Sequence, residues 1–158
     1  MDKIVGIGEF AVTGNIEDKI RTFALASCIA ITVYCPFKKA AGMIHVALPF
    51  PTDTSNLYLD KKTCYYAVTG IPFLLNKMYL EFGCLKHELI IEIYGGASSI
   101  RENDIFNIGE KNIKAVKNTL DNLNVRYTAN QIGGKHSRTL IMYVSTGKIE
   151  VILQPITI

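Results

Sequence analysis

The sequence of 158 residues contains no tryptophan and carries little net charge. Its 17 lysines and arginines stand against 14 acidic residues, which gives a net charge of +3, and the basic residues are scattered along the chain. Nucleic-acid binding usually needs a basic patch interleaved with aromatic side chains, and the sequence has no such cluster. We therefore expect no nucleic-acid partner.

Long hydrophobic runs are also lacking. No stretch approaches the roughly 18 apolar residues that a membrane-spanning helix requires. Residues 1–6 combine an early acidic residue with only a short apolar run, unlike a secretory signal or a transit peptide. The expectation is a soluble, cytoplasmic protein with no direct insertion into a membrane.

Paired cysteines are missing as well, since none of the four cysteines belongs to a CxxC motif. The four are Cys28, Cys35, Cys64 and Cys84. Their spacing does not fit a zinc site, and in a reducing cytoplasm free thiols are favoured over two disulfides. We expect no metal and no cofactor.

What the sequence does have is the composition of an ordinary folded domain, with 49% hydrophobic and 20% charged residues. A chain of this length can bury about 70% of its unfolded surface, so we expect one domain over residues 1–158. Segments of strand length outnumber helical ones. This balance predicts an α+β fold, a layered β-sheet core covered by two main helices.

The strand-like segments are apolar, rich in β-branched residues and bounded by turn residues. They cover residues 3–13, 22–34, 42–48, 88–94, 125–132, 139–144 and 148–153, the last two as a hairpin. Polar residues predict loops at 16–21 and 52–59, and a turn at 35–39.

Two segments show helical periodicity. Within residues 61–82 apolar side chains recur at spacings of three and four. Pro72 is expected to kink or restart this helix, and Gly83 is expected to end it. Asn107 and Glu110 resemble an Asn variant of a capping box that opens a second helix. The apolar stripe of the second helix consists of Ile113, Val116, Leu120 and Leu123.

Two successive strand-like segments each carry one reactive side chain. Cys28 begins an apolar run, and His45 lies in the returning segment 42–48. Two strands joined by a short turn pair side by side, so the thiol and the imidazole could meet across the ladder. A free thiol is mostly protonated at neutral pH, and a neighbouring imidazole is a base that activates it. Taken singly, each residue is at least as typical of a buried core, whereas His87 and His136 are expected at the surface.

Several motifs, in order along the chain, give this sequence a family resemblance. They are Thr22-x-x-x-x-Ser27-Cys28, Gly42-Met43-x-His45, Leu48-Pro49, Tyr94-Gly95-Gly96-Ala97, Ile108-Gly109-Glu110-Lys111-Asn112 and Gly133-Gly134 followed by Arg138. With these motifs the chain resembles the chemotaxis protein CheD from about residue 6 to residue 154. Each motif alone is weak, but their common order and spacing are specific.

The resemblance implies a protein-glutamine deamidase that converts glutamines of chemoreceptors to glutamates and releases ammonia without a cofactor. It places the nucleophile at Cys28, the general base at His45 and a supporting threonine at Thr22. The backbone N–H of Cys28, beside Ser27, is the first candidate for the oxyanion donor. The resemblance also implies a CheC-type phosphatase as a regulatory partner that competes with the chemoreceptors.

The sequence departs from the family pattern at two positions, because Ala26 and Ser137 stand where the family usually has glycine. Ala26 adds a methyl group beside the nucleophile and disfavours a positive φ there. Two other functions remain as alternatives. One is a non-catalytic adaptor that binds the receptor or the CheC-type phosphatase. The other is a thiol amidase or thioesterase for small molecules, which an enclosed apolar pocket would favour.

Overall fold

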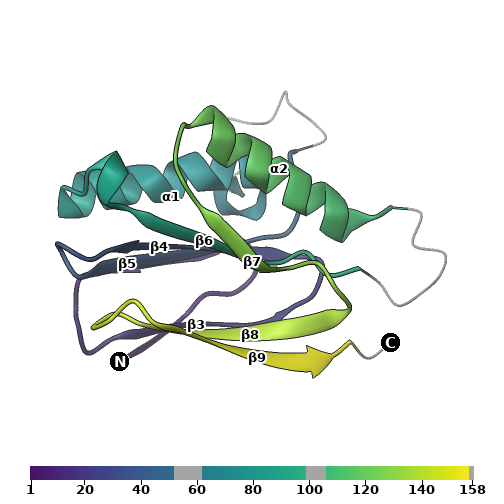
Figure 1. Ribbon diagram of the computed structural model, residues 1–158, viewed down its shortest axis with the longest axis horizontal. Coiled ribbons are helices and arrows are strands. Elements are labelled where there is room, and N and C mark those ends of the chain that lie inside the picture. Colours follow the sequence, from purple (N-terminus) through teal and green to yellow (C-terminus); the bar gives the residue numbers. More distant parts are fainter. Residues whose placement is uncertain (52–61, 99–105, 157–158) are drawn as a thin grey trace.

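The computed structural model describes residues 1–51, 62–98 and 106–156. In these ranges nine strands form two sheets, and two α-helices cover one of them. Figure 1 shows three layers in succession: the helices, a five-stranded sheet and a four-stranded sheet. The predicted α+β class, with a layered sheet core and two covering helices, is confirmed. The predicted loop at 52–59 lies outside the described residues.

The five-stranded sheet forms the middle layer, with the strand order β2-β5-β4-β6-β7. Its strands are β2 (Phe10–Thr13), β4 (Ile29–Cys35), β5 (Ala40–Val46), β6 (Ile90–Gly95) and β7 (Thr128–Ile132). Every residue of β4 and β5 is buried, since helices cover one face of these strands and the second sheet covers the other (Figure 1). Burial on both faces explains why these two strands are continuous apolar runs without alternation.

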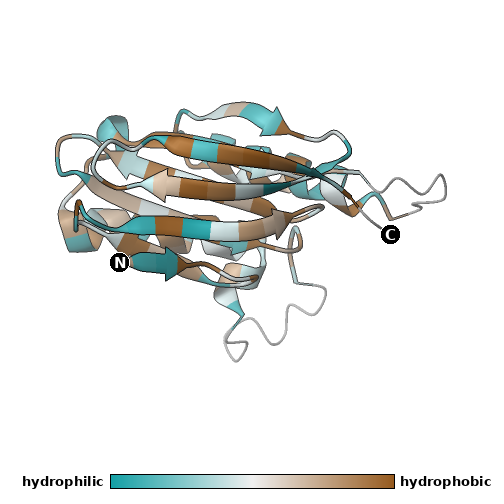
Figure 2. Cartoon of the chain, turned by 90° about the horizontal axis from the view of Figure 1, so that it is seen from below, coloured by the Kyte–Doolittle hydropathy of each residue, from teal (hydrophilic) through white to brown (hydrophobic). Residues whose placement is uncertain are grey.

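The four-stranded sheet has the order β1-β3-β8-β9. Its strands are β1 (Asp2–Ile4), β3 (Lys19–Leu25), β8 (His136–Tyr143) and β9 (Ile149–Pro155). Figure 2 shows polar and apolar residues alternating along strands of this outer layer, as one solvent-facing side requires. The hairpin predicted at 139–153 is confirmed, with both strands longer than predicted.

Two segments predicted as single strands are divided between the sheets. Residues 3–13 contribute to β1 in one sheet and to β2 in the other, with a turn at Gly8 (φ 76°) between them. Residues 22–34 hold the end of β3 and most of β4, with a bend at 26–28. Residues 19–21 were predicted as loop and are strand. These predictions were wrong because apolar composition continues through the bend, so it gives no sign of a change of sheet.

Helix α1 (Ala67–Phe82) begins later than predicted, after a 3-10 turn at Thr63–Tyr65. It continues through Pro72, so the helix does not restart there. The proline lies in the second turn, where its missing N–H removes a single intrahelical hydrogen bond. Gly83 ends the helix as predicted, with φ of 65° and its N–H directed at two carbonyls of the last turn.

Helix α2 (Ile108–Asn122) confirms the second predicted helix and its apolar stripe. Val116 and Leu120 are buried, and the other two stripe residues pack against the same core. The predicted capping box was wrong, because Asn107 has φ of 46° and its side chain makes no capping hydrogen bond.

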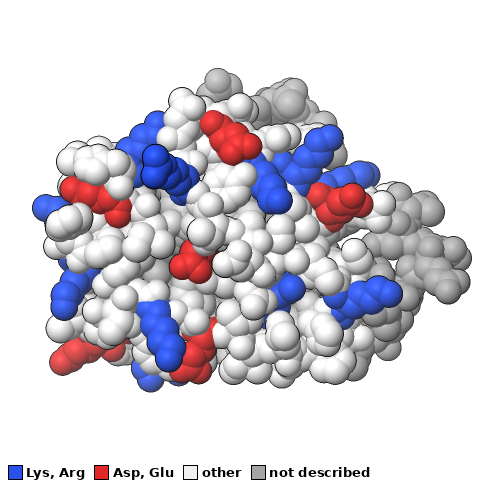
Figure 3. All heavy atoms as spheres, viewed as in Figure 1, with Lys and Arg blue, Asp and Glu red and all other residues white. Residues whose placement is uncertain are grey.

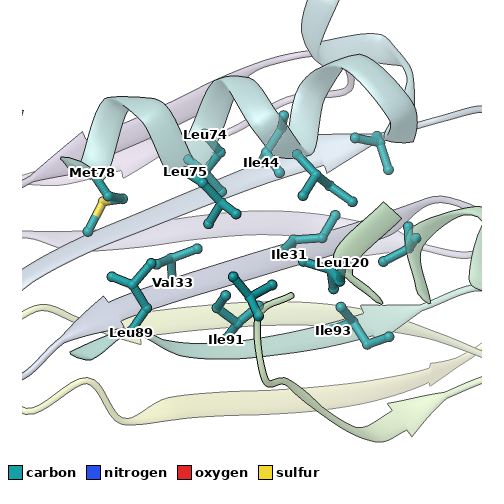
Figure 4. Packing of buried hydrophobic residues seen from close by; sticks show 14 of the residues in the cluster. Ile31, Val33, Ile44, Leu74, Leu75, Met78, Leu89, Ile91, Ile93 and Leu120 are labelled. Carbon is teal, nitrogen blue, oxygen red and sulfur yellow. The ribbon is translucent and has the colours of Figure 1, made fainter. Parts of the chain in front are cut away.

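Two hydrophobic clusters hold the layers together. The larger lies between the helices and the five-stranded sheet, and Figure 4 shows Leu74 and Met78 of α1 above Ile31 and Val33 of β4. The second lies between the two sheets and includes Ala30 and other small and large apolar residues. The chain crosses between sheets at the edge of this second cluster, and this crossing positions the candidate site.

Candidate active site

Cys28 lies in the bend where the chain passes from β3 to β4. In the antiparallel ladder of β4 and β5, Ala30 is the partner of His45. Cys28 stands two residues before Ala30, so both side chains lie on the same face, and both belong to the cluster between the sheets. His45 and Cys28 are therefore diagonal neighbours across the ladder, a relation that separates β-carbons by about 7 to 8 Å. The two segments thus pair as predicted, and the contact between thiol and imidazole stays a prediction.

Thr22 approaches the imidazole from the opposite sheet. Its hydroxyl oxygen lies 2.7 Å from His45 Nδ1 and 2.6 Å from the carbonyl oxygen of Val5. A carbonyl can only accept, so the single hydroxyl proton goes to Val5 and the Thr22 oxygen accepts from the Nδ1–H. This hydrogen-bond network assigns the tautomer with the lone pair on Nε2.

Burial keeps both members of the candidate pair uncharged. His45 is only 2% exposed, and burial lowers the pKa of its imidazole to about 4. Burial also raises the pKa of the Cys28 thiol above its ordinary value. Desolvation penalises the thiolate and the imidazolium alike. The resting site therefore holds a thiol and a neutral imidazole, whose buried Nε2 has no hydrogen-bond partner in the described parts of the chain.

The backbone carbonyls of the bend at 26–28 are each held by a different donor. The Ala26 oxygen accepts from the N–H of Ala97 at 2.7 Å, and the Cys28 oxygen accepts from the N–H of Gly96 at 2.9 Å. The Ser27 oxygen accepts from the side-chain nitrogen of Asn112 at 2.9 Å. The bend that carries Cys28 is thus held at each of its three carbonyls.

Glycine is required where the end of β6 passes this bend. Gly95 has φ of 106°, and a β-carbon there would lie 2.3 Å from the Cys28 carbonyl oxygen. No side chain fits at that distance, so the backbone of β6 can approach the bend at 26–28 only at a glycine. The motif Tyr94-Gly95-Gly96-Ala97 therefore positions the candidate nucleophile.

Asn112 is the residue of the site to which the sequence assigned no role. It is fully buried in α2, and its side-chain nitrogen also donates to the carbonyl oxygen of Ala47 at 2.9 Å. A signal for its burial exists, because it lies four residues before Val116 and eight before Leu120, on the apolar stripe of the helix.

The two departures from the family pattern are accommodated. Ala26 is not among the residues with positive φ, whereas Ala24 has φ of 53° at the irregularity of β3. Ser137 hydrogen-bonds to the carbonyl of Gln154 across the β8–β9 hairpin. The next residue, Arg138, is buried and donates to the carbonyl of Gly133 at 2.9 Å. These contacts join strands and turns.

The remaining candidate residues lie away from the site. His87 and His136 are exposed, as predicted. All four cysteines are free thiols, and Cys35, Cys64 and Cys84 are buried elsewhere in the fold. The described residues contain no group of three His, Cys, Asp or Glu side chains that could hold a metal ion.

Neither sign of charge dominates the face of the molecule that Figure 3 shows. On this face, acidic and basic side chains are interspersed. Four surface hollows are formed mainly by the helices and their connections, and neither Cys28 nor His45 lines any of these four. None of the described helices is long and apolar enough to cross a membrane.

Comparison with known proteins gives a consistent result. Residues 48–152 match the family described as CheD, chemotactic sensory transduction. A protein of Syntrophotalea carbinolica, called a probable chemoreceptor glutamine deamidase CheD, is 41% identical over 152 residues, which cover 95% of this chain and 93% of the relative. A protein of the same name from Pyrococcus abyssi is 35% identical over 147 residues, or 92% of this chain and 87% of the relative. The chain therefore belongs to the CheD family.

Proposed function

We propose that this protein is a cysteine-dependent deamidase that converts glutamines of chemoreceptors to glutamates. The relatives carry names with this activity, and the site contains the parts that it needs. The observation that carries the proposal is the hydrogen bond of 2.7 Å between Thr22 and His45 Nδ1. It leaves the lone pair of the imidazole on Nε2, on the face of the sheet where Cys28 lies.

The first half of the reaction forms a thioester. The sulfur of Cys28 attacks the carbon of the glutamine carboxamide while His45 Nε2 takes the thiol proton, a role worth on the order of 10²- to 10⁴-fold in rate. The carbonyl oxygen becomes an oxyanion, for which the Cys28 N–H is the proposed donor. The imidazolium then protonates the departing nitrogen, the C–N bond breaks, and ammonia leaves.

The second half hydrolyses the thioester. Water attacks the same carbon while His45 Nε2 takes one of its protons. The C–S bond breaks, the proton returns to the sulfur, and the new glutamic acid ionises in water. The balance is one glutamine and one water consumed, and one glutamate and one ammonium ion formed. A neutral side chain of the receptor thereby becomes negatively charged.

The lowered pKa of His45 bears on how the reaction starts. An imidazole with a pKa of about 4 is neutral at physiological pH, so it can act as a base without first losing a proton. The raised pKa of Cys28 means that the thiol is protonated until the substrate arrives. The proposal is therefore proton transfer during attack, and not a preformed ion pair of thiolate and imidazolium.

A protein substrate fits the site better than a small molecule does. Cys28 is half-buried in a bend between two sheets, and it lines none of the four hollows described above. Small-molecule sites are usually enclosed, mostly apolar pockets. A side chain presented by another protein needs only local access to the thiol.

The test is mass spectrometry of a receptor cytoplasmic fragment incubated with the wild-type protein, with Cys28→Ala and with Cys64→Ala. Cys64 is the control, because it is also a free thiol but is buried elsewhere in the fold. We expect Gln-to-Glu mass gains with the wild type and with Cys64→Ala, and none with Cys28→Ala. No gain with any of the three, together with binding of the receptor fragment by all, would instead support the adaptor function.

We also propose, from the family resemblance, that the protein acts in the cytoplasm and binds a CheC-type phosphatase. If the phosphatase and the receptor compete for one surface, adding phosphatase should slow deamidation in proportion to its occupancy. Deamidation that is unchanged at saturating phosphatase would contradict shared binding.

A further inference from the structure

We propose that Asn112 is a positioning residue that aims the backbone N–H of Cys28 into the active site as an oxyanion donor. This inference rests on the proposed function, since it assigns a residue to the same reaction. Asn112 itself does not touch the reacting atoms. It acts through the two backbone carbonyls that its amide group holds.

The first step concerns the end of the β4–β5 ladder. The register pairs Ile29 with Val46 and Ala30 with His45, so its continuation places Cys28 opposite Ala47. In an antiparallel ladder, opposite residues alternate between hydrogen-bonded and non-hydrogen-bonded pairs. The His45 N–H donates to the Glu9 carbonyl on the β2 side, so Ala30–His45 is a non-hydrogen-bonded pair, and a continued ladder would make Cys28–Ala47 one as well. The Ala47 oxygen therefore has no partner on the continuation of β4, and it accepts from the side-chain nitrogen of Asn112 at 2.9 Å. The asparagine thus connects the residue that follows β5 to helix α2.

The second step concerns the peptide between Ser27 and Cys28. The Ser27 oxygen accepts from the same nitrogen of Asn112, again at 2.9 Å. In a trans peptide the C=O of one residue and the N–H of the next point in opposite directions. Because the Ser27 carbonyl points toward α2, the Cys28 N–H points away from this helix. That is the side of the sheet on which the Cys28 and His45 side chains lie.

The third step is that the Cys28 N–H has no acceptor within the ranges that the structure describes. The carbonyls on either side of it are all occupied, by Ala97, Asn112 and Gly96 in turn. A backbone donor that is fixed in direction and left without a partner beside a nucleophile is what an oxyanion requires. The amide group of Asn112 donates one hydrogen to the Ser27 carbonyl and the other to the Ala47 carbonyl. It therefore holds the bend that carries Cys28 against the residue that follows β5, the strand of His45.

The fourth step concerns how closely helix α2 packs on the loop that follows β6. A β-carbon at Gly109 would lie 2.3 Å from the Ala97 carbonyl oxygen and 2.6 Å from that of Gly96. The first turn of α2 therefore packs directly on the loop that holds the Cys28 and Ala26 carbonyls. One helix turn carries both Asn112 and the glycine that brings it close. In the motif Gly109-Glu110-Lys111-Asn112, the glycine thus allows the close approach of α2, and the asparagine makes the hydrogen bonds that this approach permits.

The experiment compares wild type, Asn112→Ala and Asn118→Ala in two reactions. Asn118 is a matched control, because it is an exposed asparagine of the same helix. The first reaction is deamidation of the receptor fragment, which forms an oxyanion. The second is alkylation of Cys28 by iodoacetamide, in which sulfur displaces iodide and no oxyanion forms.

For Asn112→Ala we expect kcat of deamidation to fall on the order of 10²-fold, with KM and the alkylation rate little changed. A purely structural role would move both reactions together, in proportion to the folded fraction seen by circular dichroism. Should the alanine variant fail to fold, Asn112→Asp keeps the side-chain shape but has no N–H₂ to donate, and the same split is expected.

Equal kcat in the folded variant and the wild type, or parallel loss of both reactions, would overturn the role of Asn112. A wild-type protein that is alkylated at Cys28 but leaves the receptor glutamines unchanged would instead overturn the deamidase function. The two failures are therefore distinguishable.

Discussion

The single hydroxyl of Thr22 makes two hydrogen bonds, and together they determine the tautomer of His45. The hydroxyl donates to Val5 and accepts from the imidazole Nδ1–H. Thr22 is fully buried, so water cannot substitute for either partner. A neutral threonine gives orientation without the charge of a carboxylate. This agrees with a lowered pKa of His45, because a carboxylate in the same place would raise that pKa.

The role of Thr22 can be separated from its packing by two substitutions. Thr22→Val keeps the shape but removes the acceptor, so the tautomer is no longer selected, and we expect kcat to fall by up to about 10²-fold. Thr22→Ser keeps the hydroxyl and should retain most of the activity. The measurement is kcat on the receptor fragment, with thermal unfolding as a check on folding. Full activity in Thr22→Val together with a loss in Thr22→Ser would show that the methyl group, and not the hydroxyl, is what matters.

At the level of residues, the sequence predicted that Cys28 and His45 lie near each other because they belong to successive segments of the chain, and β4 and β5 pair accordingly. Their catalytic roles stay a prediction. Thr22 was identified only from the family resemblance, since its contact with His45 crosses between two sheets. Asn112 was assigned no role because asparagines on helices usually face water. The partners of Asn112 are backbone carbonyls, which every residue has. No particular side chain in the sequence therefore indicates these hydrogen bonds.

The elements around the bend at 26–28 depend on close backbone contact. Strand β6 approaches the bend at Gly95, and helix α2 approaches β6 at Gly109. A glycine in a helix is normally a weak point, since alanine is more favourable by about 1 kcal/mol. At Gly109 the contact distances reverse this preference.

Gly109→Ala is therefore expected to destabilise the protein by about 2 to 3 kcal/mol, as overpacking does. The added methyl would also push α2 away from the loop at Gly96 and Ala97, so activity of the folded protein should fall as well. Gly83→Ala is the control: Gly83 has φ of 65° but nothing within 4 Å, so it should cost about 1 kcal/mol and leave kcat unchanged. Chemical denaturation measures the stability of each variant, and kcat on the receptor fragment measures its activity. An increase in stability for Gly109→Ala would contradict the contact.

At the level of elements, periodicity predicted both helices and most strands, and it failed at changes of sheet. The run from Leu25 to Ile29 is apolar on both sides of the bend, so nothing in its composition separates β3 from β4. The split of residues 3–13 between two sheets was missed for the same reason. Local patterns report burial, and buried apolar residues occur in both sheets. Only the pairing partners, which are distant in sequence, decide the sheet.

At the scale of the whole molecule, the candidate site lies where three layers meet. Thr22 comes from the four-stranded sheet, His45 from the five-stranded sheet, Cys28 from the bend that connects them, and Asn112 from a covering helix. Hydrophobic clusters join each layer to the next, and Figure 4 shows the one between the helices and the five-stranded sheet. We propose that residues 1–158 therefore fold as one cooperative unit, in which the site and the core are lost together.

This coupling makes the buried His45 a determinant of stability at acidic pH. Its pKa is about 4 in the folded protein and about 6.5 when unfolded. Between these values the unfolded chain binds more protons, so the free energy of unfolding is intact above pH 6.5 and falls as pH decreases toward 4. The shift corresponds to a loss of about 3 kcal/mol across this window. His45→Gln should flatten the dependence, measured by urea denaturation at a series of pH values. His87→Gln, which removes an exposed histidine, should leave the dependence as in the wild type. A slope that persists in His45→Gln would show that other groups cause it, and that His45 is not buried as a neutral base in solution.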